Sequence, residues 1–311
     1  MRNALYTRFP QPAPLRRRLS FRLQIAIPMR MADDTTPSTV PRIGAIGSCR
    51  VHVPLQHAEA AGLLSYVRHT GFGYVHNPYE IEQIIKLTTG AATRPQRHLS
   101  ALMAIQKWRT LTPTSFAETS GGADALILEL SSIRILRFRG RYLQIHRFRE
   151  FLKEYGDIKL NAAFFEDHDG ARDALMEIAD RMPDDWTRTV VEELEFWEMT
   201  EDELTASLKR IHDATTQPLT FVNLVTNNFQ KQGVRQREML RDGISAFVAK
   251  HDRTRLVDPT AWVNEAGVED VMLDSSHYAP HYEPVVGRRL AEAAMESLRA
   301  VSTPARAAEP S

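Results

Sequence analysis

The sequence predicts an α/β protein in which helices cover both faces of a parallel sheet. Five short runs of apolar and β-branched residues alternate with longer stretches that have helical periodicity. Near-continuous apolar runs are typical of strands buried on both faces, and strand–helix alternation favours a doubly wound parallel sheet. The 311 residues suffice for one large α/β domain or two modest ones. We therefore expect a three-layer sandwich with a five-stranded parallel sheet.

The predicted strands and helices follow in order along the chain. Strands are expected at residues 42–47, within 63–75, and at 123–130, 219–225 and 254–258. Helical periodicity covers residues 79–87, 143–155, 171–181, 201–212, 232–250 and 284–301. Thr200 followed by Glu203 is a capping-box pattern, which predicts a helix start. The stretch 134–213 is long for one crossover, so we expect a helical insertion between the third and fourth strands, either as a lid or as helices packed on the sheet.

The two ends of the chain differ from its middle. Residues 1–31 contain seven arginines and no acidic residue, a composition that fits a targeting peptide or a start codon placed upstream of Met29 or Met31. A secretory signal fits poorly, because the apolar segment 23–28 is short and is interrupted by Gln24. We expect disorder over residues 1–40 and 302–311, one domain over 41–301, and a cytoplasmic location.

Composition argues against several classes of function. No run approaches the ~20 apolar residues that span a bilayer. The chain beyond its basic end is mildly acidic and has no basic stripe, which argues against a nucleic-acid partner, because phosphate binding needs clustered Lys and Arg. The single cysteine, Cys49, excludes an internal disulfide and a Cys-based zinc site. We expect neither a cofactor nor a metal.

A serine directly follows the first predicted strand. In an open parallel sheet, functional groups gather at the carboxyl ends of strands, next to helix N-termini. Gly47 permits a sharp turn, and Ser48 in Gly47-Ser48-Cys49-Arg50 could expose its hydroxyl beside N–H groups that stabilise an oxyanion. A serine here is also a common helix cap. Cys49 is an alternative nucleophile, and Arg50 either holds an anionic substrate or faces solvent.

The loop before the last predicted helix contains Asp274-Ser275-Ser276-His277. An aspartate three residues before a histidine lets the carboxylate reach the imidazole Nδ1–H, which leaves Nε2 free to take a proton from a serine. A structural hydrogen bond or two metal ligands are alternatives for this spacing. His281 lies four residues after His277, but the intervening Pro280 opposes a helical metal pair. The sequence therefore predicts Ser48, Asp274 and His277 as a catalytic triad.

These residues resemble the SGNH, or GDSL, hydrolase superfamily over roughly residues 42–300. That superfamily places its nucleophile after the first strand of a five-stranded parallel, flavodoxin-like sheet, and an Asp-x-x-His loop leads into its last helix. Within it the chain is most similar to the GSCFA-type branch. The Gly-Ser-Cys-Phe-Ala motif of that branch is matched by Gly47-Ser48-Cys49-Arg50-Val51, and its Asn-Pro after the second strand by Asn77-Pro78.

The resemblance leaves the oxyanion hole incomplete. The superfamily's Gly-x-Asn-Asp block is expected after the third strand, where this chain has Leu130-Ser131-Ser132-Ile133-Arg134. Loss of one oxyanion donor costs roughly 3–4 kcal/mol when nothing replaces it. We expect the N–H groups of Ser48 and Gly73 and the side chain of Asn77 as donors, with Ser131 or Ser132 as substitutes.

We also expect particular surroundings for four further polar residues. Asn227 and Asn228, after the fourth strand, are expected to line the substrate pocket. His76 has no partner that the sequence identifies, so we expect it at the surface or satisfied in the core. Glu129, in the third strand, is expected to be hydrogen-bonded because an unpaired buried carboxylate is costly, and its role stays open.

The resemblance implies a serine esterase that acts on an O-acyl group, expected to be an acetyl group on a carbohydrate or related small molecule. Two alternatives stay open. The first is an O-acyltransferase of polysaccharide biosynthesis with an acyl-coenzyme A donor, in which the insertion 134–213 would keep water from the acyl-enzyme. The second is a non-catalytic binding module on the same fold.

Overall fold

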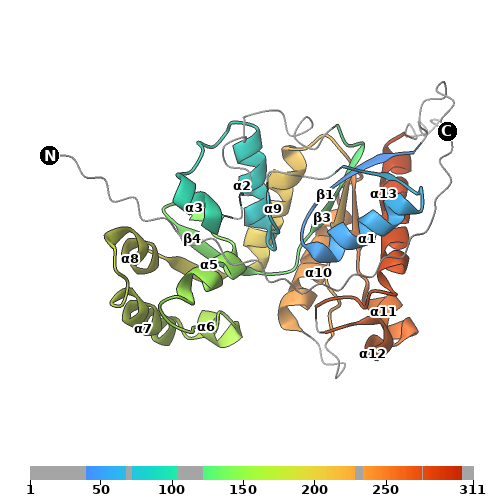
Figure 1. The fold of residues 1–311 in the computed structure, drawn as a ribbon. Helices are drawn as coiled ribbons and strands as arrows, with labels where there is room; N and C mark the ends of the chain where they lie inside the picture. The colour runs from blue at the N-terminus through green and yellow to red at the C-terminus, as the bar shows by residue number, and fades with distance from the viewer. Residues whose placement is uncertain are drawn as a thin grey trace, which may run out of the picture. The chain divides into compact units, whose positions relative to one another are not determined.

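The computed structural model describes residues 40–67, 72–103, 105, 122–227, 234–274 and 276–302. Five parallel strands form one sheet of order β2-β1-β3-β7-β8 (Figure 1). These strands are β1 (Arg42–Ile46), β2 (Ser65–Val67), β3 (Ala125–Glu129), β7 (Leu219–Val222) and β8 (Thr254–Val257). All five lie within the predicted runs, and the predicted α/β fold with a five-stranded parallel sheet is confirmed.

The apolar runs form strands because both faces of the sheet are buried. Along β3, Ala125 and Ile127 point to one hydrophobic cluster, and Leu126 and Leu128 point to the other. This alternation follows from the two-residue period of a strand. Residues 125–129 are all buried, so an unbroken apolar segment is required here instead of an alternating one.

Helices cover each face of the sheet. On one face, α1 (Cys49–Ala60) and α13 (Glu283–Ser302) pack against each other, and on the other lie α2 (Pro78–Thr88), α9 (Glu201–Asp213) and α10 (Arg235–Val248) (Figure 1). The approach of α1 and α13 depends on Gly287, because a Cβ there would lie 2.1 Å from the carbonyl oxygen of Pro54.

The helices that the sequence predicts are present in the structure. The capping box of Thr200 and Glu203 is present at the start of α9. The predicted helical stretches correspond to α2, α5, α7, α9, α10 and α13. Of the described helices, none is both long enough and apolar enough to cross a membrane. The shorter helices are α3 (Arg97–Leu102), α5 (Ile145–Leu152), α6 (Ala162–Glu166), α7 (His168–Ala179), α8 (Asp185–Glu192), α11 (Thr260–Ala266) and α12 (Val268–Val271).

The insertion 134–213 contains a small sheet in addition to the predicted helices. Strands β4 (Arg134–Phe138), β5 (Arg141–Tyr142) and β6 (Glu195–Glu198) pair antiparallel in the order β5-β4-β6. Opposite charges meet across β4 and β6, because Arg134 faces Glu198 and Arg137 faces Glu195. Such cross-strand pairs stabilise a sheet by about 0.2–1 kcal/mol each. These strands are not predicted from the sequence, because they are short and lie between strong helical patterns.

Candidate active site

Ser48 lies at the turn between β1 and α1, at the carboxyl edge of the sheet. It is the N-cap of α1, with extended backbone angles, and its Oγ accepts a hydrogen bond from the Arg50 backbone N–H at 3.3 Å. Gly47 is required at this turn, since a Cβ there would lie 2.6 Å from Cβ of Glu129. The sequence therefore places a serine hydroxyl beside a helix N-terminus, as the Gly-Ser pattern predicts.

The hydroxyl of Ser48 is held by Glu129, the last residue of β3. Ser48 Oγ lies 2.9 and 2.7 Å from the two carboxylate oxygens of Glu129, and the Ser48 backbone N–H donates to Oε2 at 2.6 Å. Ser48 is 2% exposed and Glu129 is fully buried. The carboxylate therefore occupies the position next to the Ser48 N–H where an oxyanion would be bound.

Arg50 compensates the buried charge of Glu129. Its Nε donates to Ser48 Oγ at 2.9 Å and to Glu129 Oε1 at 2.8 Å, and a terminal nitrogen lies 2.6 Å from the same Oε1. Burial by itself would raise the pKa of Glu129, but the Arg50 guanidinium, His76 and the hydrogen bonds from Ser48 outweigh it and leave this pKa below its usual value. Glu129 is therefore ionised at neutral pH.

Asp274 and His277 form the predicted pair in the loop between α12 and α13. His277 Nδ1 lies 2.8 Å from Asp274 Oδ2 and 3.0 Å from Oδ1, and the backbone N–H groups of Ser276 and His277 donate to Oδ1. Burial opposes ionisation of Asp274, but these hydrogen bonds outweigh it and lower its pKa. Both side chains are about half exposed, at 52% and 49%.

Ser48 and His277 are not hydrogen-bonded to each other in this structure. The hydroxyl of Ser48 is directed to Glu129, whereas the pair Asp274–His277 lies in a more exposed loop. Catalytic hydrogen bonds are often long in an empty site and tighten only when substrate binds. The structure thus contains each element of the predicted triad but not the contact that would complete it.

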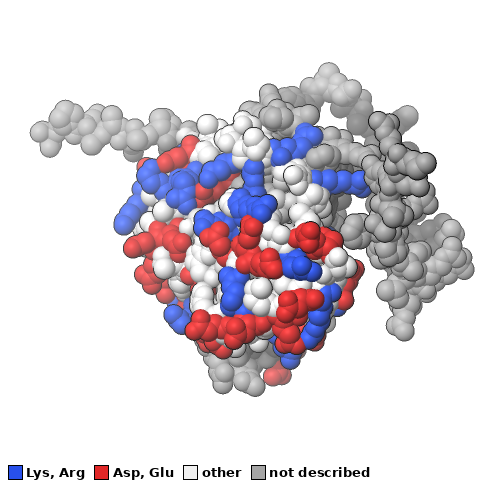
Figure 2. Space-filling view, turned by 90° about the vertical axis from the view of Figure 1, so that its left-hand side faces the viewer, with Lys and Arg blue, Asp and Glu red and all other residues white. Residues whose placement is uncertain are grey.

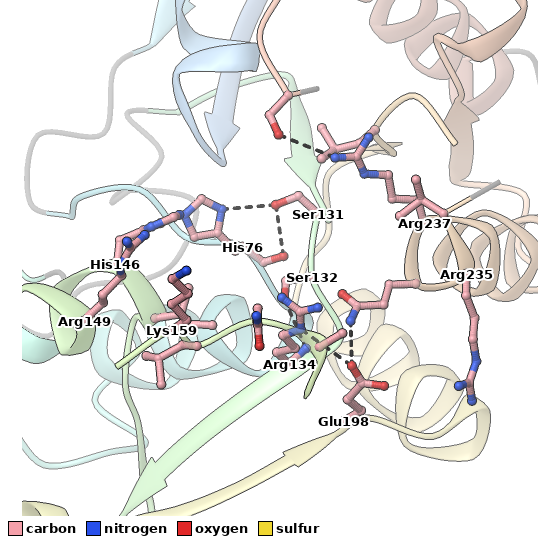
Figure 3. Close-up of a pocket in the computed structure, with 18 of the residues that line it drawn as sticks. His76, Ser131, Ser132, Arg134, His146, Arg149, Lys159, Glu198, Arg235 and Arg237 are labelled. Atoms are coloured by element: carbon pink, nitrogen blue, oxygen red, sulfur yellow. Dashed lines mark hydrogen bonds and ion pairs between the residues drawn. The ribbon is translucent and has the colours of Figure 1, made fainter. Parts of the chain in front are cut away.

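A cavity of about 620 Å³ opens next to Arg50. It lies between α5 of the insertion and α10, so that His146 and Arg149 are on one side and Arg235 and Arg237 on the other (Figure 3). Ser131, Ser132 and Ser276 contribute hydroxyl groups to its lining. The cavity is large enough for a small-molecule ligand.

The lining of this cavity is strongly basic. Two acidic residues, Glu166 and Glu198, contribute to it, and the six basic residues are Arg50, Arg134, Arg149, Lys159, Arg235 and Arg237. Arg50 and Arg134 are paired with carboxylates, but no described carboxylate forms an ion pair with Arg149, Lys159 or Arg235. On the face of the molecule shown in Figure 2, by contrast, acidic and basic residues are interspersed. The cavity therefore favours an anionic ligand.

Comparison with protein-family models matches residues 41–293 to the TviD N-terminal domain. The chain belongs to this family. The match starts at β1 and ends within α13, so it spans the five-stranded sheet and the insertion. Among solved structures, the chain is similar to a Clostridium thermocellum family 3 carbohydrate esterase, with 10% identity and a TM-score of 0.40 over 85% of this chain and 100% of that one. Comparison with curated proteins gave no match. The GSCFA-type resemblance stays a prediction.

The predicted oxyanion residues of this TviD N-terminal domain are used in different ways. Asn77 caps α2: its Oδ1 accepts from the Glu80 N–H, and its Nδ2 donates to Glu80 Oε1 and to the carbonyl of Arg134. Its side chain is thus committed to the fold and has no free donor. Gly73 is partly buried in the loop after β2 and does not line the cavity.

Ser131 and Ser132 do line the cavity. Ser132 Oγ accepts from the Arg134 backbone N–H, and Ser131 Oγ lies 3.1 Å from Nδ1 of His76. The serines that replace the asparagine block therefore belong to the same site as Arg50.

Of the two asparagines predicted to line the pocket, the structure describes Asn227. Asn227 donates from Nδ2 to Oδ1 of Asn264 at 2.9 Å and is absent from the lining, while Asn228 is outside the described residues. Cys49, the alternative nucleophile, is the first residue of α1 and is partly exposed as a free thiol. Within the described residues, no cluster of three or more His, Cys, Asp or Glu side chains is arranged to hold a metal.

Two site residues were not recognised as such from the sequence. Glu129 reaches Ser48 across 81 residues of sequence, and a carboxylate at the end of an otherwise apolar strand was the only signal for it. His76, expected at the surface or satisfied in the core, is buried, and its Nε2 has no hydrogen-bond partner among the described residues. Burial lowers the pKa of His76 to about 4, although the charge of Glu129 opposes this shift.

Glu80, which lies beside the site, is expected to make the stability of the fold depend on pH. Its carboxyl accepts from the N–H of His76 and from Asn77 Nδ2, yet burial raises its pKa to about 8. The folded state therefore keeps a proton that the unfolded state releases near its ordinary pKa of 4.5. Stability should fall as pH rises from about 5 to 8, by at most ~1.4 kcal/mol per pH unit from this group.

Glu80→Gln tests this contribution through the pH dependence of urea unfolding. The variant is expected to be less stable than wild type at pH 5, because an amide cannot accept both hydrogen bonds. The difference between the two proteins should shrink as the pH rises to 8. A constant difference across this range would contradict a raised pKa of Glu80.

Proposed function

We propose that the protein is a serine-dependent enzyme of acyl-ester chemistry, with Ser48 as nucleophile, His277 as base and Asp274 as the group that orients the base. The observation that carries this proposal is the Asp274–His277 hydrogen bond in the loop that leads into α13, together with Ser48 at the end of β1. The basic cavity is the proposed place for substrate: Arg50, which contacts Ser48, and Ser276, which belongs to the Asp274–His277 loop, line it, whereas the three triad residues themselves do not.

The reaction balances without a cofactor. Ser48 Oγ bonds to the acyl carbon while its proton passes to His277 Nε2, and the carbonyl π electrons move to the acyl oxygen. Collapse of this intermediate breaks the ester bond, and His277 returns the proton to the departing alcohol. Water, or the hydroxyl of an acceptor, then releases the acyl group by the reverse sequence. The Ser48 hydroxyl must first turn from Glu129 toward His277.

The substrate class follows from the resemblance of the motifs and from the cavity. The SGNH-like pattern supports an O-acyl ester, with acetyl on a carbohydrate as the proposed substrate. Arg149, Lys159 and Arg235, which form no ion pair with a described carboxylate, support a negative charge on the substrate or on its acyl donor. The same cations favour the second candidate, acyl transfer, because the phosphates of an acyl-coenzyme A donor would fit them.

Turnover of p-nitrophenyl acetate, with and without a sugar acceptor, tests the function. Release of p-nitrophenol by wild-type protein with water alone supports an esterase, and release that depends on the acceptor supports a transferase. A protein that shows neither, and whose Ser48 does not react with a fluorophosphonate probe, would be a binding module instead.

The charge of the cavity gives a prediction about selectivity. Arg235→Gln is expected to raise KM for 4-acetoxybenzoate about fivefold, the equivalent of ~1 kcal/mol for a partly exposed charge pair. KM for the uncharged 4-acetoxybenzamide should not change. Arg139→Gln, which removes an exposed arginine outside the lining, is the matched control. Equal effects on the two esters would show that Arg235 does not read substrate charge.

A further inference from the structure

Asn77, the side chain expected to donate to an oxyanion, is used elsewhere, and a donor without a partner among the described residues lies next to it. Asn77 is committed to capping α2, whereas the preceding residue, His76, lines the cavity and is only 7% exposed. Its Nε2 has no hydrogen-bond partner among the described residues. The atom itself is shielded from solvent. Buried polar atoms are nearly always satisfied, so an orphaned one on a residue that lines a cavity points to a ligand atom.

The backbone holds His76 beside the Ser48 turn. The N–H of Val75 donates to the carbonyl of Gly47 at 3.4 Å, which joins the loop after β2 to the end of β1. The N–H groups of Ser131 and Ser132 both donate to the carbonyl of His76, at 2.8 and 3.0 Å. His76 is therefore fixed between the ends of β1 and β3, and its ring faces the cavity with Ser131 (Figure 3).

We propose that His76 Nε2–H is the oxyanion donor that replaces the missing asparagine, and that it hydrogen-bonds the acyl oxygen of the substrate. This inference rests on the proposed function. In the attack step, the electron pair of the carbonyl bond moves to the acyl oxygen, and His76 donates a hydrogen bond to that oxygen without giving up its proton. Ser131 is then a positioning residue, since it acts through His76.

The surroundings of the ring fit a donor and not a base. Ser131 Oγ lies 3.1 Å from Nδ1 and 3.5 Å from the carbonyl oxygen of His76. A hydroxyl has a single proton, and its donation to the nearer acceptor, Nδ1, leaves the ring proton on Nε2, as the proposal requires. Burial lowers the pKa of His76 to about 4, so the ring is neutral at pH 7 and too weakly basic to take the Ser48 proton. His277, which is half exposed and bonded to Asp274, keeps that role.

Three histidine variants test the proposal with p-nitrophenyl acetate. His76→Phe keeps a ring but removes both nitrogens, and it is expected to lower kcat about 10²- to 10³-fold with KM within about twofold of wild type. His76→Gln restores an N–H near the position of Nε2 and should recover at least tenfold of this loss. His57→Gln, at an exposed position on α1, is the control and should not change kcat.

The outcomes separate this inference from the proposed function. If the wild-type protein turns over p-nitrophenyl acetate and His76→Phe has the same kcat, the role of His76 is overturned, whereas the triad is not. A rise in KM with unchanged kcat would also overturn it, because that pattern marks ordinary substrate binding. If the wild-type protein neither turns over p-nitrophenyl acetate nor reacts with a fluorophosphonate, the proposed function is overturned and the role of His76 with it.

A second measurement does not depend on activity or on the folding of a variant. In wild-type protein with ¹⁵N-labelled histidine, the imidazole nitrogen shifts at pH 7 should show His76 as the neutral Nε2–H tautomer. The Nδ1–H tautomer would leave Nε2 without a proton to donate and would overturn the proposal.

Discussion

Ser48→Ala is expected to lower kcat for p-nitrophenyl acetate by about 10⁴- to 10⁶-fold, the usual result of removing a serine nucleophile. The loss should be this large because Oγ is the atom that forms the acyl-enzyme in the proposed mechanism. The folded state should survive, because Glu129 keeps its ion pair with Arg50 and its hydrogen bond from the backbone N–H of residue 48 when Oγ is removed. Labelling by a fluorophosphonate probe should disappear in the same variant.

Two further variants make this result specific. Cys49→Ala removes the adjacent thiol and should keep both turnover and labelling. Asp274→Asn should keep the loop geometry but lower kcat by about 10⁴-fold, because the amide favours the wrong tautomer of His277. Labelling that persists in Ser48→Ala and is lost in Cys49→Ala would assign the nucleophile to the thiol and reject Ser48.

Glu129→Gln is expected to lower the free energy of unfolding by about 3–5 kcal/mol, the range measured when one partner of a buried ion pair is removed. Glu129 is fully buried, and the Arg50 side chain that it neutralises is 11% exposed. An amide leaves the Arg50 charge uncompensated and offers only one acceptor oxygen for the Ser48 N–H and O–H. Urea unfolding at pH 7, followed by circular dichroism, measures the change.

Matched variants separate the buried pair from a general effect of lost charge. Glu193→Gln breaks an ion pair with Arg139 at the surface and should leave the unfolding midpoint unchanged. The double variant Glu129→Gln with Arg50→Gln should recover part of the lost stability, because it leaves no unpaired charge in the site. A double variant less stable than Glu129→Gln alone would show that Arg50 is not balanced by Glu129.

The fold could be predicted because its signals are local and repeated. Each strand of the central sheet is a short apolar run, and burial on both faces forces that composition wherever the strand lies in the sheet. Helix starts such as Thr200 with Glu203 depend on residues three positions apart. The small sheet of the insertion was missed because β4 and β6 are separated by 56 residues of sequence, and only their pairing shows that Arg134 meets Glu198.

The sequence by itself determined the positions of Ser48 and of the pair Asp274–His277. The spacing of the pair within one loop is sufficient for its hydrogen bond, and a serine after the first strand must lie at the carboxyl edge of the sheet. Tertiary structure alone decided two features of the site: the contact of Glu129 with Ser48, and the burial of His76 against the cavity with an Nε2 that has no partner among the described residues. These contacts join residues far apart in the chain, and the burial that makes each one costly or useful does not exist until the sheet has formed.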